Sequence, residues 1–267
     1  MKDITIIIPV HVFNEEVSSM LTNAISSVPS NYPINIVTPK LLGKAIGGFS
    51  EKFENVTILS ASDENESSDF CTLVNMGASA CQTKWFSILE FDDEFTSIWF
   101  SNVEKEMDYK SDVSVFMSLV ELVDFSSKKF ISYGNEAPWA SSFSEEIGYI
   151  DNECLQDFFD FNLTGSVFNT ADWINSGGLK PSIKLTFWYE FLLRLTNNNK
   201  KVFVMPKLCY KHYVNRPNSL YDQYGNTISE KESNWWYELS RQEYFFKEDR
   251  KKVYEDSVVF NHKGDEE

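Results

Sequence analysis

The chain has 267 residues, of which 42% are hydrophobic and 15% aromatic, so it is long enough and apolar enough to fold around a sizeable core. Its formal net charge of −16 argues against nonspecific binding to nucleic acid or to an anionic membrane surface, and no such partner is expected. No apolar run is long enough to span a bilayer, and the start of the chain lacks the cleavage site of a signal peptide.

The four cysteines are scattered and form no C-x-x-C pair, which argues against a zinc ribbon or a disulfide framework. They are Cys71, Cys81, Cys154 and Cys209. Free thiols in a reducing compartment are the simplest interpretation, so we expect a cytoplasmic protein.

Strand and helix patterns alternate over the first hundred residues. The segment from Ile4 to Val10 is almost wholly apolar and β-branched, which is typical of a parallel strand buried on both faces. Asn14 then has the features of a helix N-cap, with two acidic residues in the first turn, and Pro29 ends that helix. Further strands are predicted at 34–38, 55–61 and 85–91, and a helix at 69–80. Repeated βα units of this kind predict an α/β fold with a doubly wound sheet, whose ligands lie beyond the carboxyl ends of the strands.

The second half of the chain has a more mixed pattern. A long strand is predicted at 112–124, and the Ser-, Gly- and aromatic-rich stretch 126–150 is interpreted as a loop or lid. The remaining predictions are strands at 164–170 and 201–206 and a helix at 185–197.

A last helix is predicted from Ser229, which forms a capping-box pattern with Glu232. The large apolar residues that recur on one face of this helix are Trp235, Leu239, Phe246 and Val253. Such a face docks either on its own domain or on a partner chain, so self-association through this helix is a hypothesis. We expect one domain over residues 1–220 and a helical extension over 221–267.

Four carboxylates fall within five residues at the end of the strand predicted at 85–91, in the segment Glu90-Phe91-Asp92-Asp93-Glu94. In an extended backbone, Glu90 and Asp92 point to the same side. Two oxygen donors placed in this way suit a hard divalent cation such as Mn²⁺ or Mg²⁺, which in turn binds phosphate oxygens. Taken alone, the cluster is equally compatible with a solvated acidic turn.

Several short motifs surround this cluster in a fixed order. Asn75-Met76-Gly77, Cys81, Thr83 and Trp85 lead without a gap into the acidic segment. Others are Asn14-Glu15-Glu16, Gly177-Gly178-Leu179, Leu193-Arg194-Leu195 and Pro217-Asn218-Ser219. Their order and spacing resemble those of family-2 glycosyltransferases over roughly residues 3 to 220. The resemblance implies a GT-A fold, in which a Rossmann-like, mostly parallel sheet flanked by helices joins a smaller mixed sheet.

The resemblance also implies an activity, namely metal-dependent, hexosyltransferase-like transfer of a sugar from a nucleoside diphosphate to a hydroxyl acceptor. Asp92 stands at the second Asp of the family's D-x-D motif and is implied as a metal ligand, with His212 as a further ligand. Glu90 replaces the first Asp, where a ribose or metal contact is expected. Asp93 is implied as a catalytic residue that contacts the donor sugar or the metal shell.

The nucleotide site is implied in the same way. The residues expected to contact the donor are Pro9, Val10, His11, Glu15, Asn75, Glu90 and Arg216, with Glu16 as the alternative to Glu15. Arg216 would neutralise diphosphate charge, unless it is a plain surface cation. A UDP-sugar is the favoured donor, although Thr38-Pro39 stand where the family often has an Asp that reads uracil. Candidates for that lost contact, or else residues of a solvated loop, are Asp63, Glu64, Asn65 and Asp69.

The general base is the largest departure from the family pattern. Phe187 and Trp188 occupy the two positions where an inverting member usually carries Glu-Asp. Glu190 is the nearest carboxylate and the candidate base, and its alternative is a helical i,i+4 pair with Arg194. The missing pair supports a second hypothesis, a catalytically degenerate GT-A-fold binding or structural module. A nucleotidyltransferase ranks last, because residues 10–16 contain neither the glycine nor the lysine of a phosphate-binding loop.

Overall fold

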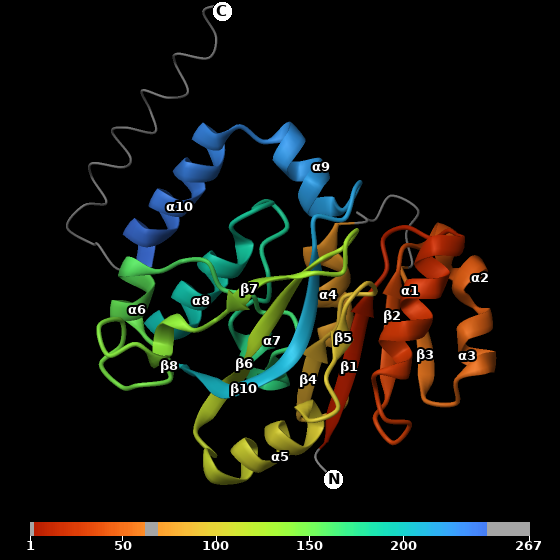
Figure 1. The fold of residues 1–267 in the computed structure, drawn as a ribbon, viewed down its shortest axis with the longest axis horizontal. Coiled ribbons are helices and arrows are strands. Elements are labelled where there is room, and N and C mark those ends of the chain that lie inside the picture. Colours follow the sequence, from red (N-terminus) through yellow and green to blue (C-terminus); the bar gives the residue numbers. More distant parts are fainter. Residues whose placement is uncertain (1–2, 62–68, 245–267) are drawn as a thin grey trace, which may run out of the picture.

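One ten-stranded sheet forms the centre of the molecule (Figure 1). The computed structural model describes residues 3–61 and 69–244. The strands follow the order β3-β2-β1-β4-β9-β6-β10-β5, with β7 paired to β6 and β8 paired to β10. Their bounds are β1 (Ile4–Pro9), β2 (Ile34–Thr38), β3 (Val56–Ser60), β4 (Trp85–Ile88), β5 (Glu94–Phe95), β6 (Val113–Asp124), β7 (Phe130–Gly134), β8 (Tyr149–Ile150), β9 (Val167–Asn169) and β10 (Lys201–Val214).

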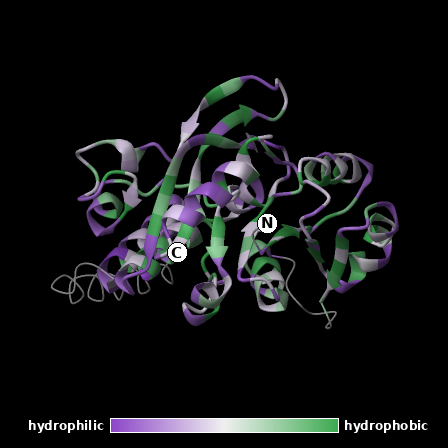
Figure 2. Ribbon diagram, turned by 90° about the horizontal axis from the view of Figure 1, so that it is seen from below, coloured by the Kyte–Doolittle hydropathy of each residue, from purple (hydrophilic) through white to green (hydrophobic). Residues whose placement is uncertain are grey.

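Helices cover both faces of this sheet, and Figure 2 shows hydrophobic residues running along the strands while the helices carry both kinds of residue. The α-helices are α1 (Glu15–Ser26), α2 (Gly43–Ile46), α3 (Gly48–Lys52), α4 (Phe70–Ala80), α5 (Trp99–Tyr109), α6 (Asn152–Asp157), α7 (Thr170–Asn175), α8 (Phe187–Asn197), α9 (Leu220–Thr227) and α10 (Glu230–Tyr244). Two short 3₁₀ helices are η1 (Lys40–Leu42) and η2 (Ala137–Trp139). The predicted α/β fold is therefore confirmed.

The N-terminal half forms for the reasons that its sequence indicates. Strands β3, β2, β1 and β4 are parallel neighbours. Because side chains alternate along a strand, Ile6 and Ile8 of β1 enter one hydrophobic cluster while Ile7 enters the cluster on the other face. The side chain of Asn14 caps α1 by accepting a hydrogen bond of 2.9 Å from the amide of Val17.

Helix α4 packs unusually close to the sheet at Gly77. A Cβ atom there would lie 2.7 Å from a methyl group of Ile7 and 2.9 Å from one of Val37, so only glycine fits without a shift of the helix. Gly77, the glycine of the Asn75-Met76-Gly77 motif (N-x-G), thus sets the spacing between α4 and strands β1 and β2.

The C-terminal half contains more strand than its sequence pattern predicts. Strand β10 does not end at Pro206 but continues to Val214, and a register shift between Met205 and Leu208 accommodates the proline. The stretch 126–150, predicted as a loop or lid, includes β7, η2 and β8. The expected smaller mixed sheet is not separate from the larger one. Strands β9, β6, β10 and β5 extend the same sheet beyond β4 through both parallel and antiparallel pairs.

The C-terminal helix α10 docks on its own chain, against α8. The ring of Tyr237 lies 5.4 Å from that of Tyr189 and 5.0 Å from that of Phe159. Of the apolar face predicted for this helix, Phe246 and Val253 lie outside the described residues. The loop candidates Asp63, Glu64 and Asn65 lie outside the described residues as well. Self-association through the helix stays a prediction.

The four cysteines carry free thiols, as their spacing predicts. Three of them, Cys71, Cys154 and Cys209, are buried. A search of the described part of the chain for a helix of the length and apolarity needed to cross a bilayer finds none.

Candidate functional site

The acidic segment after β4 lies against the far end of β10. It runs into the short strand β5, which pairs antiparallel with β10 so that Glu94 lies opposite Lys211 and Phe95 opposite Tyr210. The extension of β10 beyond Pro206 is therefore what brings the C-terminal part of the chain to the acidic cluster. The cluster itself follows the carboxyl end of a central parallel strand, where ligands of open α/β sheets bind.

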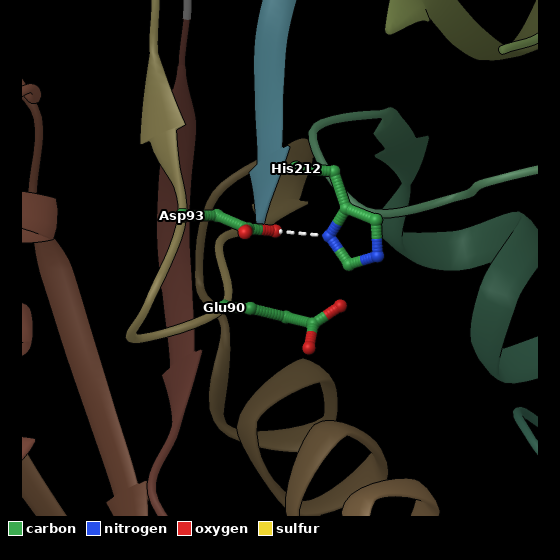
Figure 3. Close-up of side chains that lie close together, drawn as sticks. All are labelled: Glu90, Asp93 and His212. Carbon is green, nitrogen blue, oxygen red and sulfur yellow. Dashed lines mark hydrogen bonds and ion pairs between the residues drawn. The ribbon is translucent and has the colours of Figure 1, made fainter. Parts of the chain in front are cut away.

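Asp93 is the buried centre of this site, with only 1% of its surface exposed. One carboxylate oxygen accepts a hydrogen bond from the Tyr210 hydroxyl at 2.8 Å and lies 2.7 Å from Nδ1 of His212 (Figure 3). The other oxygen accepts from the backbone amide of Tyr213 at 2.8 Å. These contacts fix the orientation of the imidazole and hold the acidic segment to β10.

The position of Tyr210 depends on close packing of its ring against Gly165. The hydroxyl of Tyr210 accepts a hydrogen bond of 3.2 Å from the amide of Glu90, and its ring packs on the backbone of Gly165. Gly165 has φ +75°, and a Cβ atom there would lie 2.4 Å from the Tyr210 ring. Both the backbone conformation and the close approach therefore require glycine at this position.

We expect Gly165→Ala to destabilise the protein by roughly 1–3 kcal/mol, because it adds a strained backbone to an overpacked ring contact. Urea denaturation would measure the change. Gly225→Ala is the matched control, since Gly225 lies inside α9 with open space around it and alanine is the better helix former. Equal stability of the Gly165 variant and the native protein would contradict the assigned contact.

Glu90 completes a group of three possible metal ligands with Asp93 and His212. One ligand atom from each of the three residues lies within 4.8 Å of the others (Figure 3). Burial, followed by the negative charges of Asp93 and Asp92, raises the pKa of Glu90 to about 8. Within residues 3–61 and 69–244, the structure gives the Glu90 carboxylate no hydrogen-bond donor.

The charge of His212 is set by the same group. Burial alone would lower the pKa of His212, but the Asp93 carboxylate, through its charge and its hydrogen bond, raises that pKa to about 10. Asp93 contacts Nδ1 and leaves the other ring nitrogen, Nε2, for a further partner. A carboxylate that holds one nitrogen of a histidine while the other binds a metal is a common arrangement in metalloproteins.

Asp92 has a different partner. Its Oδ2 forms an ion pair of 2.5 Å with Nε of Arg216, and both side chains are nearly buried. The Arg216 guanidinium lies 5.0 Å from the centre of the Phe91 ring, and the imidazole of His11 lies 5.5 Å from the same ring. The structure thus groups His212 with Glu90 and Asp93, whereas Asp92, the metal ligand expected from the sequence, lies with Arg216.

The segment expected to line the nucleotide base ends β1 beside this group. Val10 is buried and its amide donates to the carbonyl of Val37. Burial, assisted by the Arg216 charge, lowers the pKa of His11 to about 4, so the imidazole is neutral at physiological pH. Pro9 is the last residue of β1, and Glu15 lies exposed in the first turn of α1.

The side chain of Asn75 is hydrogen-bonded within the chain, and its contact with the donor stays a prediction. Its side-chain amide donates to the carbonyl of Leu179 at 2.7 Å and its carbonyl accepts from the Leu179 amide at 2.8 Å. Gly178, with φ +64°, passes so close that a Cβ atom would lie 2.3 Å from the Asn75 oxygen. The N-x-G and G-G-L motifs therefore form one structural contact between α4 and the loop before α8.

Glu190 is buried in a network of ion pairs, with 1% of its surface exposed. Its carboxylate lies 2.7 Å from Arg194 and 2.7 Å from Lys180, and it accepts a hydrogen bond of 2.9 Å from Tyr244. Arg194 in turn donates to the carbonyls of Ser176 and Gly178. Despite burial, the two cations lower the pKa of Glu190. These contacts fit the i,i+4 alternative, and the role of general base stays a prediction.

The sequence pattern assigns no site role to Tyr210 or Tyr213, although both hold Asp93. Their signal is the strand period: Tyr210 and His212 are two residues apart and share one face of β10. Because Pro206 marks an expected end of the strand, that period is visible only after the strand has been extended beyond the proline.

No protein-family model matches the chain, and no curated protein matches it. Solved structures do. The structure of S. aureus TarS 1-349 in complex with UDP-GlcNAc matches with a TM-score of 0.65 and 12% identity, over 92% of this chain and 68% of that one. TarS 1-349 in complex with UDP matches with a TM-score of 0.59 and 13% identity, over 91% and 73% of the two chains.

TarS 1-349 without a named ligand gives a TM-score of 0.58 and 13% identity, over 80% of this chain. The present chain spans 60% of the length of that structure and 37% of the longer TarS chain. At these identities the likeness shows the fold alone. The fold is therefore of the GT-A-like type that the sequence predicts.

Proposed function

We propose that this chain, which has a GT-A-type fold, transfers a sugar from a nucleoside-diphosphate donor to a hydroxyl acceptor with the help of a divalent cation. The observation that carries the proposal is the group of Glu90, Asp93 and His212 beyond the carboxyl end of β4. The complexes of the structural neighbour with UDP and UDP-GlcNAc support a nucleotide-sugar donor, and a UDP-hexose is the first candidate.

The donor set of the site fits a cation such as Mn²⁺ or Mg²⁺. Carboxylate and imidazole are ligands that Mn²⁺ accepts, whereas Mg²⁺ prefers the oxygens. Burial and the charges of Asp93 and Asp92 outweigh those of His212 and Arg216 and raise the pKa of Glu90, so a further cation would stabilise its carboxylate. Glu90 and Nε2 of His212 would hold the cation, with Asp93 orienting the histidine through Nδ1.

The residues of the chain supply the rest of the donor site. When bound, the cation stabilises the negative charge that develops on the leaving diphosphate. His11 and the end of β1 would line the nucleobase, and the neutral imidazole of His11 has a buried Nε2 without a hydrogen-bond partner in the described residues. Glu190 as the base would first have to leave Arg194 and Lys180, so its carboxylate is better suited to holding the loop before α8.

The donor proposal predicts a stability gain that depends on both nucleotide and cation. With UDP at about a hundred times its dissociation constant and Mn²⁺ present, the free energy of unfolding should rise by about 2.7 kcal/mol. A thermal shift series with UDP, GDP, CDP and dTDP, each with and without Mn²⁺, measures this gain and identifies which nucleobase the site accepts. The same series with Mg²⁺ compares the two cations.

His212→Gln should remove the cation-dependent part of the gain, because glutamine offers an amide in place of the imidazole ligand. Lys207→Met is the matched control, since Lys207 is an exposed residue of the same strand. If no nucleoside diphosphate stabilises the native protein in the presence of either cation, the donor proposal is wrong.

A second candidate function is a GT-A-fold module that binds a nucleotide-sugar without turning it over. Phe187 and Trp188 favour it, because they stand where the catalytic acids of the family are expected and pack with Phe70 in an aromatic cluster. Release of UDP from UDP-GlcNAc in the presence of candidate hydroxyl acceptors separates the two functions. Donor binding without any release of UDP would favour the module.

A further inference from the structure

We infer that Arg216 holds Asp92 in an ion pair, called the latch below, until a donor diphosphate binds. The Arg216 side chain then turns to the diphosphate and releases Asp92 to the divalent cation, so that nucleotide and cation bind cooperatively. This inference rests on the proposed function, since it assigns an order of events to the same site. Arg216 is thus a positioning residue that acts through Asp92, in addition to being a charge near the donor.

The contacts of Arg216 place it between two parts of the site. Its Nε pairs with Asp92, and its guanidinium plane covers the ring of Phe91. Asp92 is also close enough to the possible metal ligands Glu90 and Asp93 for the charges to interact. The ring of Phe91 also contacts His11 at the end of β1. The guanidinium therefore lies between His11, where the nucleobase is expected, and the three possible metal ligands. A diphosphate that connects a bound nucleobase to the cation must pass through this region.

The Asp92–Arg216 pair is costly to break unless another ion replaces the lost partner. The exposed fraction is 8% for the Asp92 side chain and 11% for the Arg216 side chain. A nearly buried carboxylate that loses its cation is left with an uncompensated charge. A divalent cation beside Asp92 would supply that compensation, and a diphosphate would give the guanidinium a bidentate partner. The exchange therefore becomes favourable only when nucleotide and cation are both present.

The backbone around Arg216 suits an exchange made by the side chain alone. Asn215 and Asn218 both have left-handed backbone conformations, with φ of 62° and 61°. Pro217 lies between them, and the carbonyl of Arg216 accepts a hydrogen bond from the amide of Ser219. Asn215 also bonds to Asp124 of β6. This turn anchors the Cα atom of Arg216 at the end of β10, so that only its flexible side chain has to change partner.

The test is the affinity for Mn²⁺ alone, measured by calorimetry on the native protein and on Arg216→Met, which removes the charge at similar volume. The latch predicts that the variant binds Mn²⁺ about tenfold more tightly without nucleotide, because Asp92 is no longer neutralised by a side chain; a tenfold change corresponds to about 1.4 kcal/mol. It also predicts weaker binding of UDP in saturating Mn²⁺. Lys207→Met, which removes an exposed cation of β10, should change neither affinity.

A double variant identifies the residue that Arg216 restrains. In Asp92→Asn/Arg216→Met the unpaired carboxylate is gone, so the gain in Mn²⁺ affinity should disappear. Circular dichroism and the metal-free melting temperature of each variant show whether it is folded. If Arg216→Met leaves Mn²⁺ affinity unchanged or weaker, or if the double variant keeps the gain, the latch is overturned.

The same titrations separate the latch from the proposed function. If the native protein binds UDP with Mn²⁺ but the Arg216 variant shows no gain for Mn²⁺ alone, only the latch fails. If the Arg216 variant binds Mn²⁺ more tightly through Asp92 while no nucleoside diphosphate binds any form of the protein, the donor proposal fails, and of the latch only the restraint of Asp92 by Arg216 stands. Absence of any Mn²⁺ binding in every variant, both with and without UDP, overturns both.

Discussion

Replacement of Glu190 by alanine should lower the free energy of unfolding by about 3–5 kcal/mol, the loss expected when one partner of a buried ion pair is removed. Arg194 would keep its place in the core without its carboxylate, and Lys180 and Tyr244 would lose the same acceptor. Since Arg194 also holds the carbonyls of Ser176 and Gly178, the loop before α8 should loosen with it.

Urea denaturation measures this loss, with Glu54→Ala as the control for removal of an exposed acid, which should change stability by less than about 0.5 kcal/mol. Glu190→Gln tests the general-base hypothesis more directly, because it keeps an acceptor oxygen. A stable Gln variant that binds donor normally but has lost turnover would favour the base. A variant that unfolds early, with turnover lost only in proportion to the unfolded fraction, would favour the structural role.

Glu90→Gln should have two opposite effects, because the carboxylate is a candidate ligand and the folded metal-free protein disfavours its charged form. In the presence of nucleotide and Mn²⁺, the variant should show none of the stabilisation expected of the native protein. In the metal-free state it should melt at a higher temperature than the native protein at pH 8. Glu94→Gln removes a charge from the same segment, outside the three-residue group, and should keep the cation effect.

The sign of the metal-free effect follows from the pKa of Glu90. The folded protein raises that pKa from its ordinary value of 4.5 to about 8. Between these two values the folded state holds a proton that the unfolded state has lost, so native stability falls as the pH rises. The advantage of the Gln variant should therefore be absent below pH 4.5, grow from there and level off above pH 8. A constant difference across this range would contradict the assignment.

The parallel half of the fold could be predicted because its signals are local. The uniform apolar character of β1 and the cap Asn14 lie in the sequence next to the elements that they define. The C-terminal half was harder, since Pro206 normally ends a strand and here is absorbed by a shift in register. Strand β7 begins within a Ser-rich stretch that has the composition of a loop.

The acidic segment of the candidate site could also be predicted, whereas the partner of each carboxylate could not. Asp92 and Asp93 are adjacent in sequence, yet one faces Arg216 and the other faces His212. Which of two neighbouring side chains meets which cation depends on the register between β5 and β10. For Glu190, the spacing to Arg194 did indicate the ion pair, but Lys180 and Tyr244 come from other parts of the chain.

The pairing of the acidic segment with β10 also has a consequence for folding. Asp93 meets its partners Tyr210, His212 and Tyr213 across 117, 119 and 120 residues of chain. Contacts of such long sequence separation form slowly, because closing a large loop reduces the entropy of the chain before the contacts compensate. During synthesis, strands β1 to β4 can pair while β10 has yet to leave the ribosome. We therefore expect the sheet to exist before the candidate site does, and the last strand to arrive is the one that assembles it.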